Sequence, residues 1–453
     1  MSNEYIVVGN SKKLSGKLSL VGAKNAVLVT MASLLLTDGV SRLSNVPNSQ
    51  DVLNMIKLLK CLGAKVVFDP ENNIIEVDTT GVNKYQVPRD IMKQMRASVL
   101  VMGPLLARFG CADIVLPGGC VIGARPINYH LANFEKMGAQ VNISGELITA
   151  RALGSRVLSS EATSLKATKI ILEYPSVGAT ENILMAATLT KGVTKIINAA
   201  LEPEVLDLIC VLKKMGAHIE LLPAATILIE GVECLRPVEH NVMYDRLEAG
   251  ALLLASAMTG GEIYLPDAPS YAMDMFLMKL KEMGHDVQVG DGQKGVRLKA
   301  TLNPKAVSFK TGPYPGFPTD LQAPMMAAQC VAEGESIVCE TVFENRLLHV
   351  RELQKMGAQI KVEHNKAIIT GVRELYGAPV IATDIRASCA LVLAGFVAEG
   401  QTVMTGVHHF RRGYDSLEKK LSQMGASIEI KTSQDKNFKN PEREDDKAQL
   451  LNS

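Results

Sequence analysis

The sequence predicts an α/β protein built from six repeated units that are grouped in two domains. Three observations support this fold class. A tag of the type Met-Gly-Ala recurs six times, a second glycine precedes each tag at a nearly constant interval, and helical and strand-like patterns alternate between them. With 453 residues, of which 47% are apolar, the chain is too long for one simple core and sufficiently apolar for two.

The tags mark the same point in every unit. They are Leu62–Ala64, Met137–Ala139, Met215–Ala217, Met283–His285, Met356–Ala358 and Met424–Ala426, and their glycines recur at intervals of 68 to 78 residues. Glycine adopts a positive φ without a Cβ clash, so it commonly follows the last residue of a helix. Each tag is therefore interpreted as a helix end that leads into a strand, with no catalytic role.

Within each unit the first element is an apolar helix that ends at a glycine. In the first unit this helix includes Met31–Leu36 and ends at Gly39. The corresponding glycines of the later units are Gly110, Gly192, Gly260, Gly334 and Gly400, and all six lie 23 to 28 residues before their tag glycine. A short strand follows, for example Ser336–Cys339, which is rich in small and β-branched residues.

The second helix of a unit is amphipathic and leads into two strands. Val52, Met55, Ile56 and Leu59 fall on one face of a 3.6-residue period. After the tag, the strands Lys65–Phe68 and Ile74–Asp78 are separated by turn-forming residues. Every unit is thus expected to contain a helix, a strand, a second helix and a strand pair.

Composition excludes several classes of function. The formal net charge is +1, there is no tryptophan, and aromatic residues make up 4%, whereas a nucleic-acid-binding protein would show a basic excess. None of the eight cysteines forms a Cys-x-x-Cys pair, and the eight histidines form no metal-binding motif. We therefore expect no metal and no nucleic acid, and any anion must be bound by a few well-placed lysines and arginines.

The ends of the chain and its hydropathy predict a cytoplasmic protein. No apolar run is long enough and free enough of charge to span a bilayer, and Met1–Gly16 lacks the pattern of a secretory signal. From Ser433 onward the repeat pattern gives way to polar residues, which predicts a disordered tail over 433–453.

The segment Leu116–Pro126 departs from the repeat pattern. It follows the expected strand Ala112–Leu116 and contains three glycines, with Cys120 between them and Arg125 five residues later. Glycines allow the backbone to approach a ligand closely, and a nearby arginine can make a thiol more acidic. A tight turn that carries an incidental cysteine would explain the same residues.

Charged residues recur where helices are expected to begin. Lys24 lies in Gly22–Ala26, and similar positions occur in Phe317–Ala323, Thr383–Ser388 and Tyr244–Glu248. A helix N-terminus offers free N–H groups and a positive dipole end to an anion. Ordinary capping by a solvated side chain would also account for each of these charges.

Taken together, these motifs resemble those of the enolpyruvyl transferases. The resemblance covers about Glu4 to Ile430. Its most specific pieces are Gly22–Ala26, Gly118–Pro126, Ser176–Thr180, Phe317–Ala323, Glu344–Arg346 and Asp384–Ser388. The loop with Cys120 is most similar to the family members whose acceptor is UDP-N-acetylglucosamine. The branch that uses shikimate 3-phosphate lacks this long loop.

The resemblance implies two inside-out, barrel-like α/β domains of three repeats each. One domain would comprise residues 1–21 and 245–432, and the other residues 22–244 with the Cys120 loop. It also implies transfer of the enolpyruvyl group of phosphoenolpyruvate to the 3-hydroxyl of UDP-N-acetylglucosamine, without a cofactor. The chain is expected to act as a monomer or a weak homo-oligomer.

The resemblance assigns catalytic roles to four residues. Cys120 matches the acidic thiol that handles protons or transiently attaches phosphoenolpyruvate, and that fosfomycin would alkylate. Asp320 matches the carboxylate that hydrogen-bonds the 3-hydroxyl and is the candidate base. Lys24 and Arg412, together with Arg125, match the cations around phosphoenolpyruvate.

Further positions match substrate-binding residues of the family. The positions that match contacts to the anion site or to the sugar are Asn25, Arg96, Val342, Arg346, Asp384 and Arg386. Those of the nucleotide-binding segments are Arg125, Pro126, Ile127, Asn128, Tyr129, Ser176, Val177 and Gly178. The sequence departs from the family pattern at two positions of the uridine contacts: Tyr174-Pro175 stands where some members carry a basic residue, and Asn128 stands where an acidic residue is common.

Two other functions remain open from the sequence. One is the sibling reaction with shikimate 3-phosphate, and Cys120 argues against it. The other is a non-catalytic relative that binds a sugar nucleotide. The joint presence of Lys24, Cys120, Asp320 and Arg412 argues against this second alternative.

Overall fold

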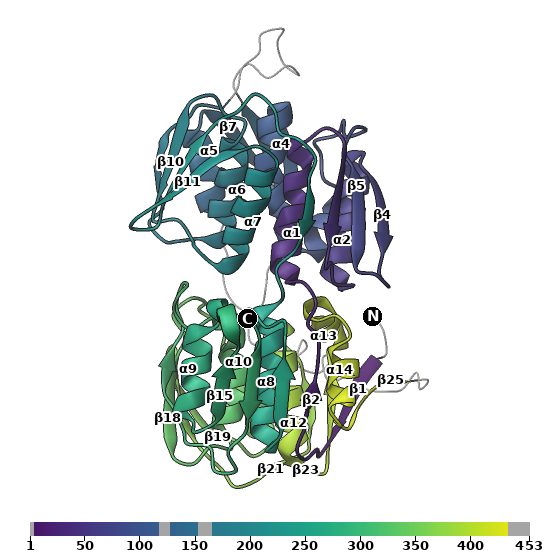
Figure 1. Cartoon of the computed structure of the whole chain (residues 1–453), viewed down its shortest axis with the longest axis vertical. Helices are drawn as coiled ribbons and strands as arrows, with labels where there is room; N and C mark the ends of the chain where they lie inside the picture. The colour runs from purple at the N-terminus through teal and green to yellow at the C-terminus, as the bar shows by residue number, and fades with distance from the viewer. Residues whose placement is uncertain (1–3, 117–126, 153–164, 434–453) are drawn as a thin grey trace. The chain divides into compact units, whose positions relative to one another are not determined.

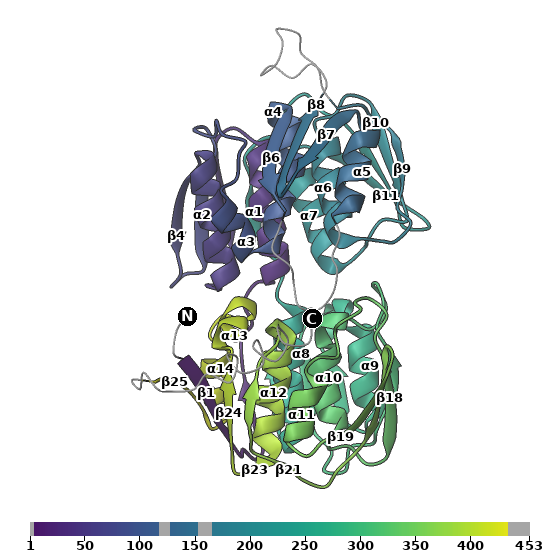
Figure 2. The same ribbon diagram turned by 180° about the vertical axis from the view of Figure 1, so that it is seen from behind.

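The computed structural model describes residues 4–116, 127–152 and 165–433, which form two compact units. The middle unit comprises the described part of residues 21–244, and the terminal unit comprises residues 4–20 and 245–433. Figures 1 and 2 show helices and sheets in both. Cys120, Arg125, Pro126 and the predicted disordered tail after Ser433 lie outside the described residues.

The middle unit contains three copies of the expected order of elements. The first is α1 (Lys24–Ser33), β3 (Val40–Ser44), α2 (Gln50–Leu62), β4 (Lys65–Asp69) and β5 (Ile74–Asp78). The second is α4 (Met102–Phe109), β6 (Cys111–Val115), α5 (Asn128–Lys136), β7 (Ala139–Ser144) and β8 (Leu147–Ala152). The third is α6 (Val177–Ala187), β10 (Val193–Ile197), α7 (Pro203–Lys214), β11 (His218–Leu222) and β12 (Thr226–Glu230).

Short linking elements complete the middle unit. They are the 3-10 helix η1 (Leu34–Leu36), α3 (Arg89–Gln94), the 3-10 helix η2 (Arg96–Val101), β9 (Lys169–Ile171) and β13 (Glu239–Asn241). The three sheets have the orders β13-β3-β5-β4, β6-β8-β7 and β11-β12-β10-β9. Both β13 and β9 pair in parallel with the first strand of a repeat, whereas the strand pairs are antiparallel.

The terminal unit repeats the same plan. The fourth repeat is α8 (Arg246–Thr259), β14 (Glu262–Leu265), α9 (Asp274–Glu282), β15 (Asp286–Val289) and β16 (Val296–Lys299). The fifth is α10 (Gln322–Gln329), β18 (Glu335–Cys339), α11 (Val350–Lys355), β19 (Gln359–Glu363) and β20 (Lys366–Thr370). The sixth is α12 (Ile385–Val397), β24 (Gln401–Thr405), α13 (Val407–Gly413), α14 (Leu417–Gln423) and β25 (Ile428–Thr432).

The remaining elements of this unit are short, apart from the N-terminal strand. They are β1 (Glu4–Gly9), β2 (Gly16–Lys17), η3 (Ser270–Ala272), η4 (Asp291–Gln293), β17 (Phe309–Lys310), η5 (Thr319–Leu321), β21 (Leu375–Tyr376), β22 (Pro379–Ile381) and β23 (Ala398–Glu399). The sheets have the orders β22-β24-β1-β25, β15-β16-β14-β2 and β17-β18-β20-β19, and β21 pairs with β23. Because β1 lies between β24 and β25, the N-terminal strand completes the sixth repeat.

The sequence predicts one continuous second helix in the sixth repeat, and the structure differs from this prediction. The helical stretch is divided into α13 and α14, and Ser416 between them has a φ of 51°. A residue in the left-handed region cannot continue a right-handed helix. The chain therefore turns between Arg412, at the end of α13, and the tag that follows α14.

The first helix of each repeat is a core element. In α1, nine of ten residues are buried, in α8 twelve of fourteen, and in α12 eleven of thirteen. A helix that is buried all round must lie inside its unit. The strands alternate buried and exposed residues, as in β3 and β18, so one face of each sheet is turned to solvent. Helices inside and sheets outside confirm the predicted inside-out architecture (Figure 1).

The predicted helix-ending glycines all adopt a positive φ. This holds for the six tag glycines, with Gly63 at 110° and Gly357 at 92° as examples, and for the six earlier ones, such as Gly260 at 75°. The conformation is the one that terminates a helix without a Cβ clash, so the structural interpretation of the tags is confirmed. Of the earlier six, only Gly110 and Gly260 cap their helices. The prediction was wrong for Gly39, Gly192, Gly334 and Gly400, because those helices are already capped two to four residues before, by Thr37, Thr188, Cys330 and Ala398. Among the described helices, none combines the length and apolar character that crossing a bilayer would require.

Candidate active site

The terminal unit places Asp320 in the 3-10 helix η5, directly before α10. The loop that leads to it is anchored by Phe317, which is fully buried and packs against Phe309 and Phe276, with ring centroids 4.3 and 6.1 Å away. The side chain of Asp320 is 26% exposed. Its carboxylate is therefore held on a rigid base and keeps a face that a ligand can approach.

Two buried guanidinium groups hold this carboxylate. Nη2 of Arg346 donates to Oδ1 of Asp320 at 2.9 Å, and Nη2 of Arg386 donates to Oδ2 at 2.9 Å. The arginine side chains are only 3% and 5% exposed. Burial by itself would lower the pKa of the Arg386 guanidinium. Nearby groups, chiefly the Asp320 carboxylate, raise it by more, so the pKa of Arg386 lies well above its ordinary range.

Arg386 is positioned by the N-terminus of α12. Asp384 is the N-cap of this helix, and its Oδ1 accepts from the backbone N–H groups of Arg386 at 2.8 Å and Ala387 at 3.1 Å. The guanidinium of Arg386 also lies over the ring of Tyr414, 5.4 Å from its centroid. The predicted residues Asp384 and Arg386 thus act together, because one aspartate fixes the backbone from which the arginine extends.

Arg346 extends from the turn that follows β18. Its guanidinium lies 5.4 Å from the ring centroid of Phe343, and its Nε is buried without a hydrogen-bond partner among the described residues. Val342 belongs to the same turn. The predicted sugar contact at Val342 and the arginine that holds Asp320 therefore lie on one segment.

Two histidines near this cluster are neutral at neutral pH. Burial lowers the pKa of His349 to about 4, with Asp384 raising it and Arg346 lowering it further. Burial also lowers the pKa of His409 to about 4, and the charges of His408 and Arg412 act in the same direction. Asp384 acts on His409 in the opposite direction, so Arg412 and Asp384 both lie near this histidine of α13.

In the middle unit, Lys24 is the first residue of α1 and is buried. Its Nζ forms an ion pair with Oδ2 of Asp51 at 3.2 Å, and both side chains are at most 10% exposed. Asn25, the next residue, is exposed. The helix start predicted at Gly22–Ala26 is confirmed, and it presents a lysine with a fixed position together with an accessible amide side chain.

The middle unit also brings the predicted nucleotide-binding segments together. Ile127–Tyr129 lies at the start of α5 and Ser176–Gly178 at the start of α6, where the Ser176 hydroxyl accepts from Ala179 N at 3.4 Å. The two helix starts touch, because a Cβ on Gly178 would lie 3.1 Å from Cε1 of His130. Burial and then the Arg96 charge lower the pKa of His130 to about 3, which places Arg96 near the same point.

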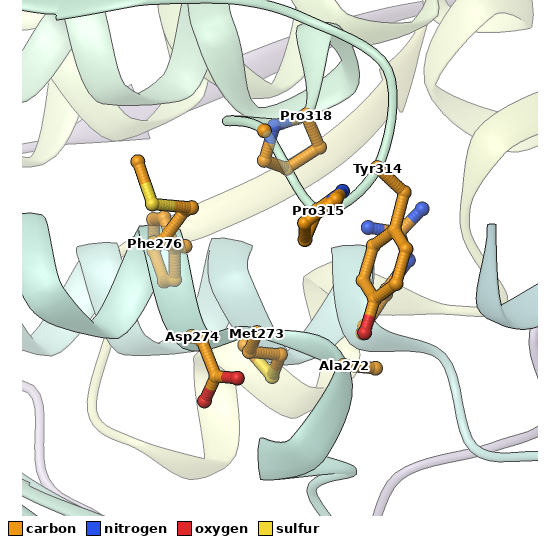
Figure 3. A pocket seen from close by; sticks show the side chains of 10 residues that line it. Ala272, Met273, Asp274, Phe276, Tyr314, Pro315 and Pro318 are labelled. Carbon is orange, nitrogen blue, oxygen red and sulfur yellow. The ribbon is translucent and has the colours of Figure 1, made fainter. Parts of the chain in front are cut away.

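A pocket in the terminal unit lies beside the Asp320 segment (Figure 3). Apolar side chains and the proline-rich loop line most of it, with Arg246 and Asp274 as charged members. The lining residues are Arg246, Ala272, Met273, Asp274, Met275, Phe276, Tyr314, Pro315, Gly316 and Pro318. Pro318 is two residues before Asp320, so this pocket adjoins the candidate site. The pocket itself was not predicted from the sequence, although Pro318 and Arg246 belong to segments singled out there.

Comparisons with known proteins identify the family. Residues 8–434 match the family model described as EPSP synthase (3-phosphoshikimate 1-carboxyvinyltransferase). The chain belongs to this family. Among its curated relatives, the UDP-N-acetylglucosamine 1-carboxyvinyltransferase of Geobacter metallireducens is 45% identical over 94% of the chain and 99% of the relative.

Two further similarities agree with this family. The UDP-N-acetylglucosamine 1-carboxyvinyltransferase 1 of Caldanaerobacter subterraneus subsp. tengcongensis is 48% identical, over 93% of the chain and 98% of the relative. The crystal structure of the enolpyruvyl transferase NikO from Streptomyces tendae superposes with a TM-score of 0.85 at 23% identity, covering 96% of this chain and all of NikO. The family resemblance and the fold class predicted from the sequence are therefore confirmed.

Sequence reasoning missed several residues that shape these sites. Asp51 pairs with Lys24, and Tyr414 packs against Arg386. His349 is fully buried beside Arg346 and Asp384, and Glu340 is buried behind the Val342 turn. Asp51 carried a weak signal as an acidic residue in the first turn of α2, but such residues are common at helix starts.

Proposed function

We propose that this chain transfers the enolpyruvyl group of phosphoenolpyruvate to the 3-hydroxyl of UDP-N-acetylglucosamine and releases phosphate, the first committed step of peptidoglycan synthesis. One observation carries the proposal: relatives that bear the name of this activity are 43% to 48% identical over 93% to 94% of the chain. This similarity extends along nearly the whole length of both proteins.

The chemistry requires a base, an acid and a set of cations. The hydroxyl oxygen forms a bond to C2 of phosphoenolpyruvate while the hydroxyl loses its proton and the methylene carbon gains one. The resulting tetrahedral intermediate then loses phosphate together with a proton from the new methyl group, which restores the double bond. Negative charge on phosphate and carboxylate must be neutralised throughout.

Asp320 is the proposed base for the hydroxyl proton. One carboxylate oxygen faces each guanidinium, so the group has a fixed orientation, and its 26% exposure leaves it accessible to the acceptor. A carboxylate that is oriented before the substrate arrives needs no reorganisation during the reaction. Arg346 and Val342, from the same turn, are proposed to contact the sugar.

Cationic residues are proposed to hold phosphoenolpyruvate. They are Lys24, which is fixed by Asp51, and Arg412 and Arg386 in the terminal unit, with Asp384 supporting Arg386. Arg125 is assigned to the same task and Cys120 to proton handling. Asn25, Arg96, Ile127–Tyr129 and Ser176–Gly178 are assigned to the sugar nucleotide, with Pro126. By the same resemblance, the enzyme is proposed to act in the cytoplasm, without a cofactor, as a monomer or weak homo-oligomer.

The second candidate acceptor is shikimate 3-phosphate, because the family model carries the name of that reaction. The test measures phosphate release from phosphoenolpyruvate with each acceptor at matched concentrations. We expect release with UDP-N-acetylglucosamine and none above background with shikimate 3-phosphate. The reverse pattern would assign the sibling reaction, and release with neither would contradict both.

A further inference from the structure

Glu340 is a buried carboxylate directly behind the candidate site. It follows the last residue of β18, is 1% exposed, and forms no ion pair with any cation among residues 4–116, 127–152 and 165–433. Removing a carboxylate from water is unfavourable unless hydrogen bonds replace those to solvent. The partners of Glu340 therefore indicate what the residue does.

Four donors converge on this carboxylate. Oε1 accepts from the Thr311 hydroxyl at 2.9 Å and from the backbone N–H groups of Val342 at 2.8 Å and Phe343 at 3.2 Å. Oε2 accepts from the Thr319 hydroxyl at 2.8 Å. A carboxylate only accepts hydrogen bonds, so it can bind all four donors at once.

Three of these donors belong to the two segments that meet at Asp320. Thr319 is the residue before Asp320, and Val342 and Phe343 begin the turn that leads to Arg346, which donates to Asp320 Oδ1. The contacts form a closed ring through Glu340, Thr319, Asp320, Arg346 and the turn. The ring fixes the position of the carboxylate of Asp320 relative to the Val342 turn.

The backbone of Glu340 is itself fixed. Its N–H donates to the Asn365 carbonyl at 2.9 Å, and the Asn365 amide side chain donates back to the Glu340 carbonyl at 2.9 Å. The next residue, Thr341, donates its N–H to the Thr311 hydroxyl at 2.9 Å. Glu340 therefore transfers the rigidity of the β18–β20 pair to both segments of the site.

We propose that Glu340, acting through Thr319, is a positioning residue for enolpyruvyl transfer. It sets the placement of the Asp320 carboxylate against the turn that is proposed to contact the sugar, and so the approach of this carboxylate to the acceptor hydroxyl. The inference rests on the proposed function, because it assumes that Asp320 receives that proton. Misplacement of a reacting group by about 1 Å can lower a rate roughly 10²-fold.

Thr319→Val tests this role with a minimal change. Valine has nearly the shape of threonine and removes only the donor to Oε2, so the other three hydrogen bonds of Glu340 remain. We expect kcat for phosphate release with UDP-N-acetylglucosamine to fall about 10- to 100-fold, and Thr319→Ser, which restores the hydroxyl, to recover most of it. Glu340→Gln should also keep most of kcat, because its oxygen can take both backbone N–H groups while the Thr319 hydroxyl rotates to accept.

Thr259→Val is the matched control in the same unit. Thr259 is the last residue of α8, and its hydroxyl accepts from Leu14 N at 3.1 Å. We expect this variant to lower the melting temperature about as much as Thr319→Val while kcat stays at the wild-type value. Wild-type kcat in Thr319→Val would overturn the inference, and so would an equal loss of kcat in Thr259→Val. Absence of phosphate release by the unaltered enzyme would instead overturn the proposed function on which the inference rests.

Discussion

At the scale of single residues, the central feature is the carboxylate of Asp320 between Arg346 and Arg386. Each of its oxygens accepts one hydrogen bond from a guanidinium that is at least 95% buried. Charge-assisted bonds of this kind are strong and directional, so they orient the carboxylate as well as stabilising it. The same contacts make the three residues interdependent for folding.

Asp320→Asn tests what this carboxylate contributes to stability and what it contributes to catalysis, because the two effects are measured separately. The amide removes the hydrogen-bonded counter-charge of two buried guanidinium groups, which is expected to cost about 3–5 kcal/mol of unfolding free energy. It also removes the proposed base, and kcat should fall about 10²- to 10⁴-fold. Urea unfolding and steady-state phosphate release measure the two effects.

Glu4→Gln is the control for Asp320→Asn. It neutralises the acidic partner of Arg411, 2.8 Å away, in a pair whose arginine is 50% exposed. An exposed pair contributes about 0–1 kcal/mol, so stability and kcat should change little. Unchanged kcat in Asp320→Asn would contradict the role given to this carboxylate.

At the scale of elements, the proposed site residues of each unit lie at the N-termini of its central helices. Lys24 begins α1, Asp320 lies just before α10, and Asp384 and Arg386 lie at the start of α12. The helices themselves are buried, so only their first residues can present polar groups to a ligand. Their free N–H groups and positive dipole ends suit an anionic substrate.

Substitutions at Asp384 test how the cap supports the site. Asp384→Ala removes the acceptor for Arg386 N and Ala387 N and is expected to cost about 0.5–2 kcal/mol, together with a loss of kcat because Arg386 shifts. Asp384→Asn retains a capping oxygen and should unfold close to the wild type. Thermal unfolding and kcat are measured for both.

Ser49→Ala provides the comparison, since Ser49 caps α2 in the middle unit through Val52 N. We expect a similar loss of stability with an unaltered kcat. If Ser49→Ala lowered kcat as much as Asp384→Ala, the effect of capping would be general rather than specific to α12.

The order of elements was predictable from the sequence because its signals are local. Each signal is contained in a short stretch of the chain. Examples are the glycine that follows a helix, the 3.6-residue period of α2 and the alternation of buried and exposed residues in β5. The division between α13 and α14 was missed, since Ser416 gives no obvious sign of a left-handed conformation.

The contacts of the candidate site were less accessible to sequence reasoning. Family resemblance identified Asp320, Arg346 and Arg386, but the bonds among them join residues 26 and 66 positions apart and depend on tertiary packing. Glu340 was missed for the same reason. A glutamate after a strand is ordinarily a surface residue, and its burial follows from how β18 packs against the loop before α10.

At the scale of the whole molecule, several buried histidines link stability to pH. Burial lowers the pKa of His285 and of two histidines near Asp384 to about 4, and that of His130 to about 3, against an ordinary value of 6.5. The unfolded chain then binds more protons than the folded chain between about pH 6.5 and 4. Stability is therefore complete above pH 6.5 and is lost as pH falls through this window.

We expect the free energy of unfolding to be lower at pH 5 than at pH 7.5, by about 1–2 kcal/mol for each such histidine. Glu181 opposes the trend, because burial followed by Glu204 and Glu202 raises its pKa well above the ordinary value. Urea unfolding followed by circular dichroism is suitable for a chain without tryptophan.

His285→Asn is the control for this pH dependence. The Nδ1 atom of His285 accepts from Thr301 N at 3.2 Å, and an asparagine oxygen can take the same bond without titrating. The variant should lose less stability on acidification than the wild type. An equal or larger loss in the variant would show that His285 does not contribute in the way its burial indicates.

The central claim is that this chain joins enolpyruvyl groups to UDP-N-acetylglucosamine. The most direct measurement incubates the enzyme with phosphoenolpyruvate and UDP-N-acetylglucosamine and follows phosphate and the mass of the sugar nucleotide together. We predict that the sugar nucleotide gains one enolpyruvyl group for each phosphate released, and that Asp320→Asn loses both signals. Phosphate release without a change in the mass of the sugar nucleotide, or no release at all, would contradict the account.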